Sequence, residues 1–157
     1  MKKLPRWMRV VMLTTAVLNV FGAITFLPAA GALRAQGGLP VEAPPIYLAM
    51  ISLFILVFGL AYLWIAFTGK ADVLFVTVAA AGKLAFFGLL VIYWMMEAVP
   101  AAAISSGMGD LVIGSLFLLW IVKLRSETRR SSNAAAPLTP IGSNAHVQRT
   151  TASQAIP

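Results

Sequence analysis

Long stretches of apolar residues alternate with short polar segments along this chain of 157 residues. Each stretch is close to the roughly 20 residues that a helix needs to cross the hydrocarbon core of a membrane. Proline, glycine and charged residues separate the stretches and mark the loops. The pattern predicts an all-α polytopic membrane protein, in which four transmembrane helices form a bundle with short loops. The predicted spans are approximately Val10–Leu27, Ile46–Phe67, Val73–Met96 and Ala101–Val122.

The composition supports lipid as the main solvent of this fold. The chain is 60% hydrophobic and 11% charged, whereas soluble domains are about half apolar and about a quarter charged. Cysteine is absent, which excludes a disulfide framework, a thiolate metal site and a CxxC redox centre.

The basic residues flank the apolar stretches, and their distribution predicts the topology. Cytoplasmic segments of membrane proteins carry an excess of lysine and arginine, so we expect both termini in the cytoplasm and the chain in the inner membrane of a bacterium. Nucleic-acid binding is the weaker interpretation, because both basic clusters adjoin hydrophobic spans. Arg34, Glu42 and Glu97 then lie on the outer side. The residues assigned to the cytoplasm are Lys2, Lys3, Arg6, Arg9, Lys70, Lys123, Arg125, Arg129, Arg130 and Arg149.

These assignments divide the chain into three parts. Residues 1–9 form a basic cytoplasmic N-terminus, residues 10–122 form the transmembrane domain, and residues 123–157 form a disordered cytoplasmic tail. The end of the tail is rich in Ala, Ser, Thr, Asn and Pro, a composition that buries too little apolar surface to fold. An alternative makes the first stretch a cleaved signal peptide, with small residues at positions 29–32. That stretch is longer than a typical signal-peptide core of 7–15 residues, which favours a retained span.

Lys83 and Asp110 are charged residues inside predicted spans. Lys83 follows Asp72, the start of its span, by eleven residues, which places it roughly 16 Å deep. Asp110 follows Ala101 by nine residues, which places it roughly 14 Å deep from the opposite side. Consecutive antiparallel helices are usually neighbours. The sequence therefore predicts that the two charges meet near the middle of the membrane.

Small and polar residues extend this prediction to a cluster. Small residues at helical spacing let two membrane helices approach closely. Asn19 is also at about mid-depth, and Ser106 precedes Asp110 by one turn. We therefore expect Asn19, Lys83, Ser106 and Asp110 to surround one internal polar site. The expected helix-packing positions are Gly22, Gly59, Ala79, Gly107 and Gly114.

Two functions fit such a cluster. A buried Lys–Asp pair can fix the register of the helices, which suits a non-enzymatic accessory or assembly protein. Intramembrane ionisable groups also mark ligand and ion pathways, which suits a small carrier or binding protein for a polar or ionic ligand or a proton. We identify no catalytic residues, metal ligands or cofactor motif, so an enzyme acting on lipid or quinone has the least support. The expected partners are the lipid bilayer and a second copy of the chain or another membrane protein.

Several short motifs resemble uncharacterised small bacterial membrane proteins. They lie at residues 21–23, 38–40, 58–62, 81–84 and 109–111, together with Arg34, and read FGA, GLP, FGLAY, AGKL and GDL. The four-span layout is more distantly similar to the DoxX-like group, over roughly residues 8–122. This resemblance implies a four-helix bundle in the inner membrane. Some members of that group are associated with thiosulfate-linked or quinone-linked redox enzymes, but the absence of cysteine does not favour a direct redox role here.

Overall fold

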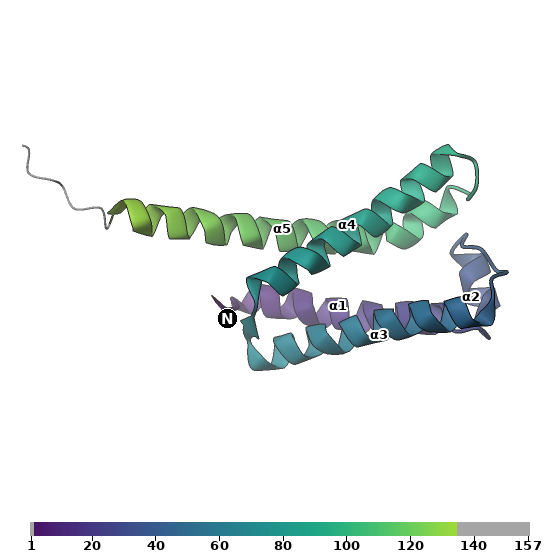
Figure 1. Ribbon diagram of the computed structural model, residues 1–157, viewed down its shortest axis with the longest axis horizontal. Helices are drawn as coiled ribbons and strands as arrows, with labels where there is room; N and C mark the ends of the chain where they lie inside the picture. The colour runs from purple at the N-terminus through teal and green to yellow at the C-terminus, as the bar shows by residue number, and fades with distance from the viewer. Residues whose placement is uncertain (1, 135–157) are drawn as a thin grey trace, which may run out of the picture. The chain divides into compact units, whose positions relative to one another are not determined.

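The computed structural model describes the backbone of residues 2–134 and the side chains of residues 2–130. Four long helices dominate these residues, with one short helix between the first two (Figure 1). In chain order the elements are β1 (Lys2–Lys3), α1 (Arg6–Thr25), α2 (Gly31–Gln36), α3 (Pro45–Thr68), β2 (Lys70–Ala71), α4 (Val73–Met95) and α5 (Ala102–Ala134).

The predicted fold class is confirmed. The helices α1, α3, α4 and α5 are each long and apolar enough to cross a membrane, and they coincide with the four predicted spans. Large apolar side chains point outward along them; Phe21, Phe54 and Leu119 are each more than half exposed. Soluble proteins rarely expose so much contiguous apolar surface, so these faces suit contact with lipid.

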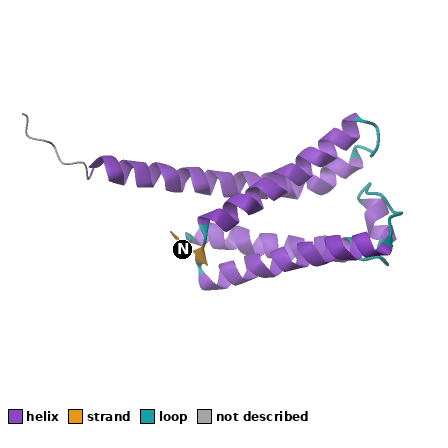
Figure 2. Cartoon of the chain, in the orientation of Figure 1, coloured by secondary structure: helices purple, strands orange, loops and turns teal. Residues whose placement is uncertain are grey.

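The bundle has two ends, which we call the sheet end and the loop end. The loop end contains the connection from α1 to α3, which includes α2, and the connection from α4 to α5. At the sheet end, β1 pairs antiparallel with β2, so that the N-terminus is joined to the connection between α3 and α4 (Figure 2). The helix α1 already begins at Arg6, so the predicted N-terminal segment 1–9 is divided between strand and helix. A two-residue strand has no periodicity to detect in the sequence, and this pairing is absent from our sequence-based prediction.

Two side chains fix helix ends at the sheet end. The Asp72 carboxylate accepts hydrogen bonds from the backbone N–H groups of Leu74 and Phe75, at 2.7 and 3.4 Å. It thereby satisfies N–H groups that lack partners at the start of α4. The Arg9 guanidinium donates to the carbonyl oxygens of Ala66 and Phe67, at 2.9 and 3.2 Å. Those two carbonyls lie in the last turn of α3, so Arg9 ties the first turn of α1 to it.

The buried apolar core occupies the half of the bundle nearest the sheet. All four long helices contribute to it, and the sheet is anchored to it by Leu4 and Ala71. The core ends near mid-depth, at the level of the polar residues Asn19, Lys83 and Asp110. Its members are Leu4, Met8, Met12, Ala16, Tyr62, Ile65, Ala66, Ala71, Val76, Ala79, Ala80, Ile113, Phe117, Trp120 and Ile121.

Glycines bring α1 against α3, as the sequence predicts. A Cβ placed on Gly59 would lie 3.1 Å from the Cβ of Asn19, and one on Gly22 would lie 3.4 Å from the side chain of Ile55. The hydroxyl of Ser52 on α3 also donates to the carbonyl oxygen of Ala23 on α1, at 2.7 Å. Close backbone approach of this kind is the usual packing device of membrane helices.

The same device joins α4 and α5. A Cβ on Gly107 would lie 2.7 Å from the side chain of Leu90, and one on Gly114 would lie 2.9 Å from the side chain of Leu84. Ala79 on α4 is 4% exposed. All five predicted helix-packing positions therefore lie at helix–helix contacts or in the buried core.

We expect Gly59 and Gly82 to respond differently to substitution by alanine. Glycine in a helix costs about 1 kcal/mol relative to alanine, and a Cβ at Gly82 meets nothing within 4 Å among the described residues. Gly82→Ala should therefore raise the stability of the protein. Gly59→Ala should gain nothing, and Gly59→Leu should lose about 1–3 kcal/mol through overpacking against Asn19. Thermal unfolding of the purified variants tests this, and equal shifts at both positions would contradict the packing of α1 on α3.

The loop between the first two spans is more ordered than its prolines and glycines predict. It contains α2, and Arg34 in the last turn of that helix is 2% exposed. The sequence assigns Arg34 to the outer side with Glu42 and Glu97 but gives no sign of its burial, and the structure buries its guanidinium within this loop. The backbone then passes over the start of α5, where a Cβ on Gly38 would lie 2.9 Å from the backbone nitrogen of Ala103.

The helix α5 continues beyond the predicted end of the fourth span at Val122. Its part up to Leu124 belongs to the bundle, and its part from Arg125 to Ala134 belongs to a separate unit. The prediction of a disordered tail from residue 123 is therefore wrong for residues 123–134, which are helical. The apolar pattern ends before Arg125, Arg129 and Arg130, but the helix continues through these residues. The rest of the predicted tail, residues 135–157, lies outside the described residues.

Candidate functional site

Lys83 on α4 forms an ion pair with Asp110 on α5, as the depth estimates predict. The sequence around Lys83 fixes its position, because Ala79 and Ala80 lie one turn earlier and are 4% and 0% exposed. That face of α4 therefore packs inward and carries Lys83 with it. The Lys83 side chain is 10% exposed and the Asp110 side chain is 26% exposed. The cation is thus nearly enclosed, while the carboxylate remains partly accessible.

Asn19 on α1 completes the predicted contact with Lys83. Its Oδ1 accepts a hydrogen bond from the Lys83 ammonium group at 3.4 Å, and its Nδ2 donates to the backbone carbonyl oxygen of Ile55 on α3 at 3.1 Å. Gly59 permits this approach, since Asn19 lies against the position where a Cβ would be. A continuous polar chain therefore runs from α3 through α1 and α4 to α5.

Tyr62 is a member of the site that our sequence-based selection omitted. Its ring centroid lies 5.9 Å from the Lys83 Nζ, within the range of a cation–π contact. The same ring packs against Phe75 and Phe117, with centroid separations of 5.6 and 5.9 Å. It is itself a member of the apolar core at the sheet end, so it connects Lys83 to that core. The spacing of Gly59 and Tyr62, which puts both on one helical face, is the signal that could have identified it.

Ser106 does not belong to this site, contrary to the prediction. Its hydroxyl donates to the backbone carbonyl oxygen of Gly37 at 2.8 Å, and its side chain is exposed. Spacing placed Ser106 correctly on the face of Asp110, one turn closer to the loop end. A serine side chain is too short to return from there to mid-depth. The loop residue Gly37 lies over it instead, and Ser106 fastens the loop to α5.

The charges and hydrogen-bonding groups of the site are mostly satisfied within the protein. Asn19 uses both its carbonyl oxygen and its amide nitrogen, and the Lys83 ammonium group contacts Asp110, Asn19 and the Tyr62 ring. The partly exposed Asp110 carboxylate is the group that remains reachable from outside. Within the described residues, no cluster of three or more His, Cys, Asp or Glu side chains could hold a metal ion.

Comparison with protein-family models, curated proteins and solved structures finds no match to this chain. The similarity to the DoxX-like group therefore stays a prediction.

Proposed function

We propose that this chain is a multi-pass inner-membrane protein with a non-enzymatic accessory or assembly role. The observation that carries the proposal is the polar chain formed by Asn19, Lys83 and Asp110. Its hydrogen-bonding groups connect four helices to one another. Polar contacts between membrane helices specify which helices meet. A bundle fixed in this way offers its outer apolar faces as a contact surface for another membrane protein or a second copy.

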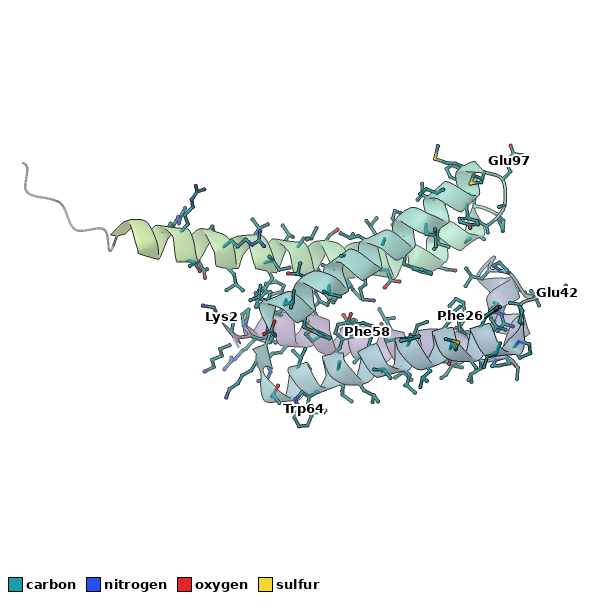
Figure 3. All side chains as sticks on the ribbon, viewed as in Figure 1. Lys2, Phe26, Glu42, Phe58, Trp64 and Glu97 are labelled. Atoms are coloured by element: carbon teal, nitrogen blue, oxygen red, sulfur yellow. The ribbon has the colours of Figure 1, made fainter. Side chains whose placement is uncertain are left out.

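The charges at the two ends support the proposed orientation, with both termini in the cytoplasm. Lysine and arginine residues gather at the sheet end, where Figure 3 labels Lys2. The loop end carries the acidic residues Glu42 and Glu97, which the figure also labels, and its Arg34 is buried. The positive-inside rule assigns the sheet end to the cytoplasm.

A second function is favoured by one observation, the partial exposure of the Asp110 carboxylate. A carboxylate that is paired with a lysine on one side and open on the other can accept a proton or an ionic ligand. In this alternative, the chain is a small carrier or binding protein, and a second copy would complete the pathway.

The neutral variant Lys83→Met/Asp110→Leu distinguishes the two functions. Volume-matched apolar residues can replace a buried ion pair with little change in stability. An accessory role therefore predicts that the variant folds, keeps the native mass of the wild-type assembly in nanodiscs, and complements a deletion strain. We expect this result.

Asp110→Glu, which keeps the charge, is the matched control. A carrier or proton site predicts that the neutral variant folds and assembles normally but fails to complement, while Asp110→Glu retains partial function. That outcome would overturn the accessory role and support the alternative.

A further inference from the structure

The short sheet places two lysines directly opposite each other. In the register of β1 and β2, Lys3 faces Lys70 and Lys2 faces Ala71. Side chains directly opposite in an antiparallel pair lie on the same face of the sheet, within about 4.5–5.5 Å at their Cβ atoms, and like charges there are destabilising. The fold therefore holds together two positive charges that repel each other.

The core determines which face carries this pair. Leu4 and Ala71 are 5% and 0% exposed and belong to the apolar core. Alternate residues of a strand point to opposite faces, so Lys3 and Lys70 point away from the core. Both lysines are exposed. The backbone N–H of Leu4 donates to the carbonyl oxygen of Gly69 at 2.9 Å, which extends the pairing and keeps the two lysines in register.

Two exposed tryptophans indicate the level of this sheet in a membrane. Trp7 lies in the first turn of α1 and Trp64 in the last turns of α3, next to β1 and β2 respectively. Tryptophan is enriched at the level of the lipid headgroups. Figure 3 shows Trp64 and Lys2 at the same end of the bundle. The Lys3–Lys70 pair therefore lies where the phosphate groups of lipids are found.

Neighbouring charged groups leave this pair positive. Arg6 is exposed beside it in the sequence and adds to the charge. Arg9 is engaged with the carbonyl oxygens at the end of α3. The Asp72 carboxylate, the acidic group nearest to Lys70 in the sequence, is engaged in capping α4. A negatively charged group from outside the chain would relieve the repulsion.

We propose that Lys3 and Lys70 bind the phosphate group of an anionic lipid headgroup. A phosphodiester between the two ammonium groups converts their repulsion into two charge-assisted hydrogen bonds. A headgroup without a cation of its own, such as phosphatidylglycerol, fits this site better than zwitterionic phosphatidylcholine. The site depends on the sheet end alone, so it stands independently of the accessory role and of the Lys83–Asp110 pair.

The test compares the full-length wild type with Lys3→Gln/Lys70→Gln. Each purified protein receives phosphatidylglycerol, phosphatidylcholine or inorganic phosphate in detergent, and thermal unfolding and native mass spectrometry report stability and bound lipid. We expect phosphatidylglycerol to raise the unfolding midpoint of the wild type by several degrees, and the variant to lose at least half of that rise. Without anionic lipid, the variant should be as stable as the wild type or more stable, because the repulsion is gone.

Arg129→Gln/Arg130→Gln is the control, since it removes two exposed positive charges from α5 and leaves the sheet unchanged. It should keep the response to phosphatidylglycerol. A response to inorganic phosphate that disappears only in the lysine variant would also support the site, with free phosphate as the source. Equal losses in both double variants, or no response to either anion, would overturn the proposal.

Discussion

Replacing Asp110 by asparagine should lower the free energy of unfolding by about 3 kcal/mol. The change leaves the Lys83 ammonium group nearly enclosed and without a counter-charge, since the new amide, the Asn19 carbonyl oxygen and the Tyr62 ring beside it are all neutral. Removing one partner of a buried ion pair typically costs about 3–5 kcal/mol. The lower end applies because the Asp110 side chain is a quarter exposed, and snorkelling and local water defects lower the cost of an intramembrane charge at an open position.

The opposite single change should cost less. Lys83→Met leaves the Asp110 carboxylate without its lysine, but that carboxylate is the more exposed partner, and a local water defect lowers the cost of an intramembrane charge at an open position. Asp110→Asn should therefore be less stable than Lys83→Met. Reversible unfolding of the purified protein in mixed detergent measures both, and similar stabilities would contradict the unequal burial of the pair.

Two double variants control for the loss of charge. Lys83→Met/Asp110→Leu should return to within about 1 kcal/mol of the wild type, because no unpaired charge remains. The charge swap Lys83→Asp/Asp110→Lys should recover only part of the loss. In the swap, the Asn19 Oδ1 that accepts from Lys83 would face a carboxylate. If both single variants were as stable as the wild type, the pair would contribute nothing to the bundle.

The pairing of Lys83 with Asp110 could be predicted because helix geometry turns sequence distance into depth. Each residue advances the helix by a fixed rise, so counting from two opposite ends located both charges at the same level. Asn19 followed from the same count. Ser106 did not, because its partner is the backbone carbonyl oxygen of Gly37 in a loop. Every residue has a backbone carbonyl, so such a contact leaves no sequence signal.

Neither the sheet nor the burial of Arg34 could be predicted from the sequence, for related reasons. The pairing of Lys3 with Lys70 joins segments far apart in the chain through strands of two residues each, which are too short for any alternation to appear. The positive-inside rule uses basic residues near a span only to assign the side of the membrane, so Arg34 was assigned to the outer side and its burial was not considered. The carbonyl oxygens that bind Arg34 are brought together only by the folded conformation of the loop.

Replacing Arg34 by methionine should lower the free energy of unfolding by about 3 kcal/mol and release the loop between α1 and α3. The Arg34 guanidinium donates to the carbonyl oxygens of Thr25, Leu27 and Val41, at 3.1, 2.7 and 3.1 Å. Thr25 is the last residue of α1, where carbonyl groups lack helical partners. Methionine fills a similar volume but donates no hydrogen bond, so the three acceptors lose their partner.

The effect of Arg34→Met should extend to the start of α5. The segment held by Arg34 continues into Gly37 and Gly38, which contact Ser106 and Ala103 on α5. Hydrogen–deuterium exchange should therefore increase both in residues 37–44 and in the first turns of α5. Exchange around Lys83, at mid-depth, should change little, because its contacts with Asn19 and Asp110 do not involve the loop.

Two further variants separate the hydrogen bonds of Arg34 from its charge. Arg34→Lys keeps the charge, but an ammonium group cannot span three carbonyl oxygens as a planar guanidinium does, so we expect it to recover at most half of the lost stability. Glu42→Gln alters an exposed side chain of the same loop and should leave stability and exchange unchanged. If lysine restored full stability, the buried charge alone would hold the loop, and the geometry of the three hydrogen bonds would be unimportant.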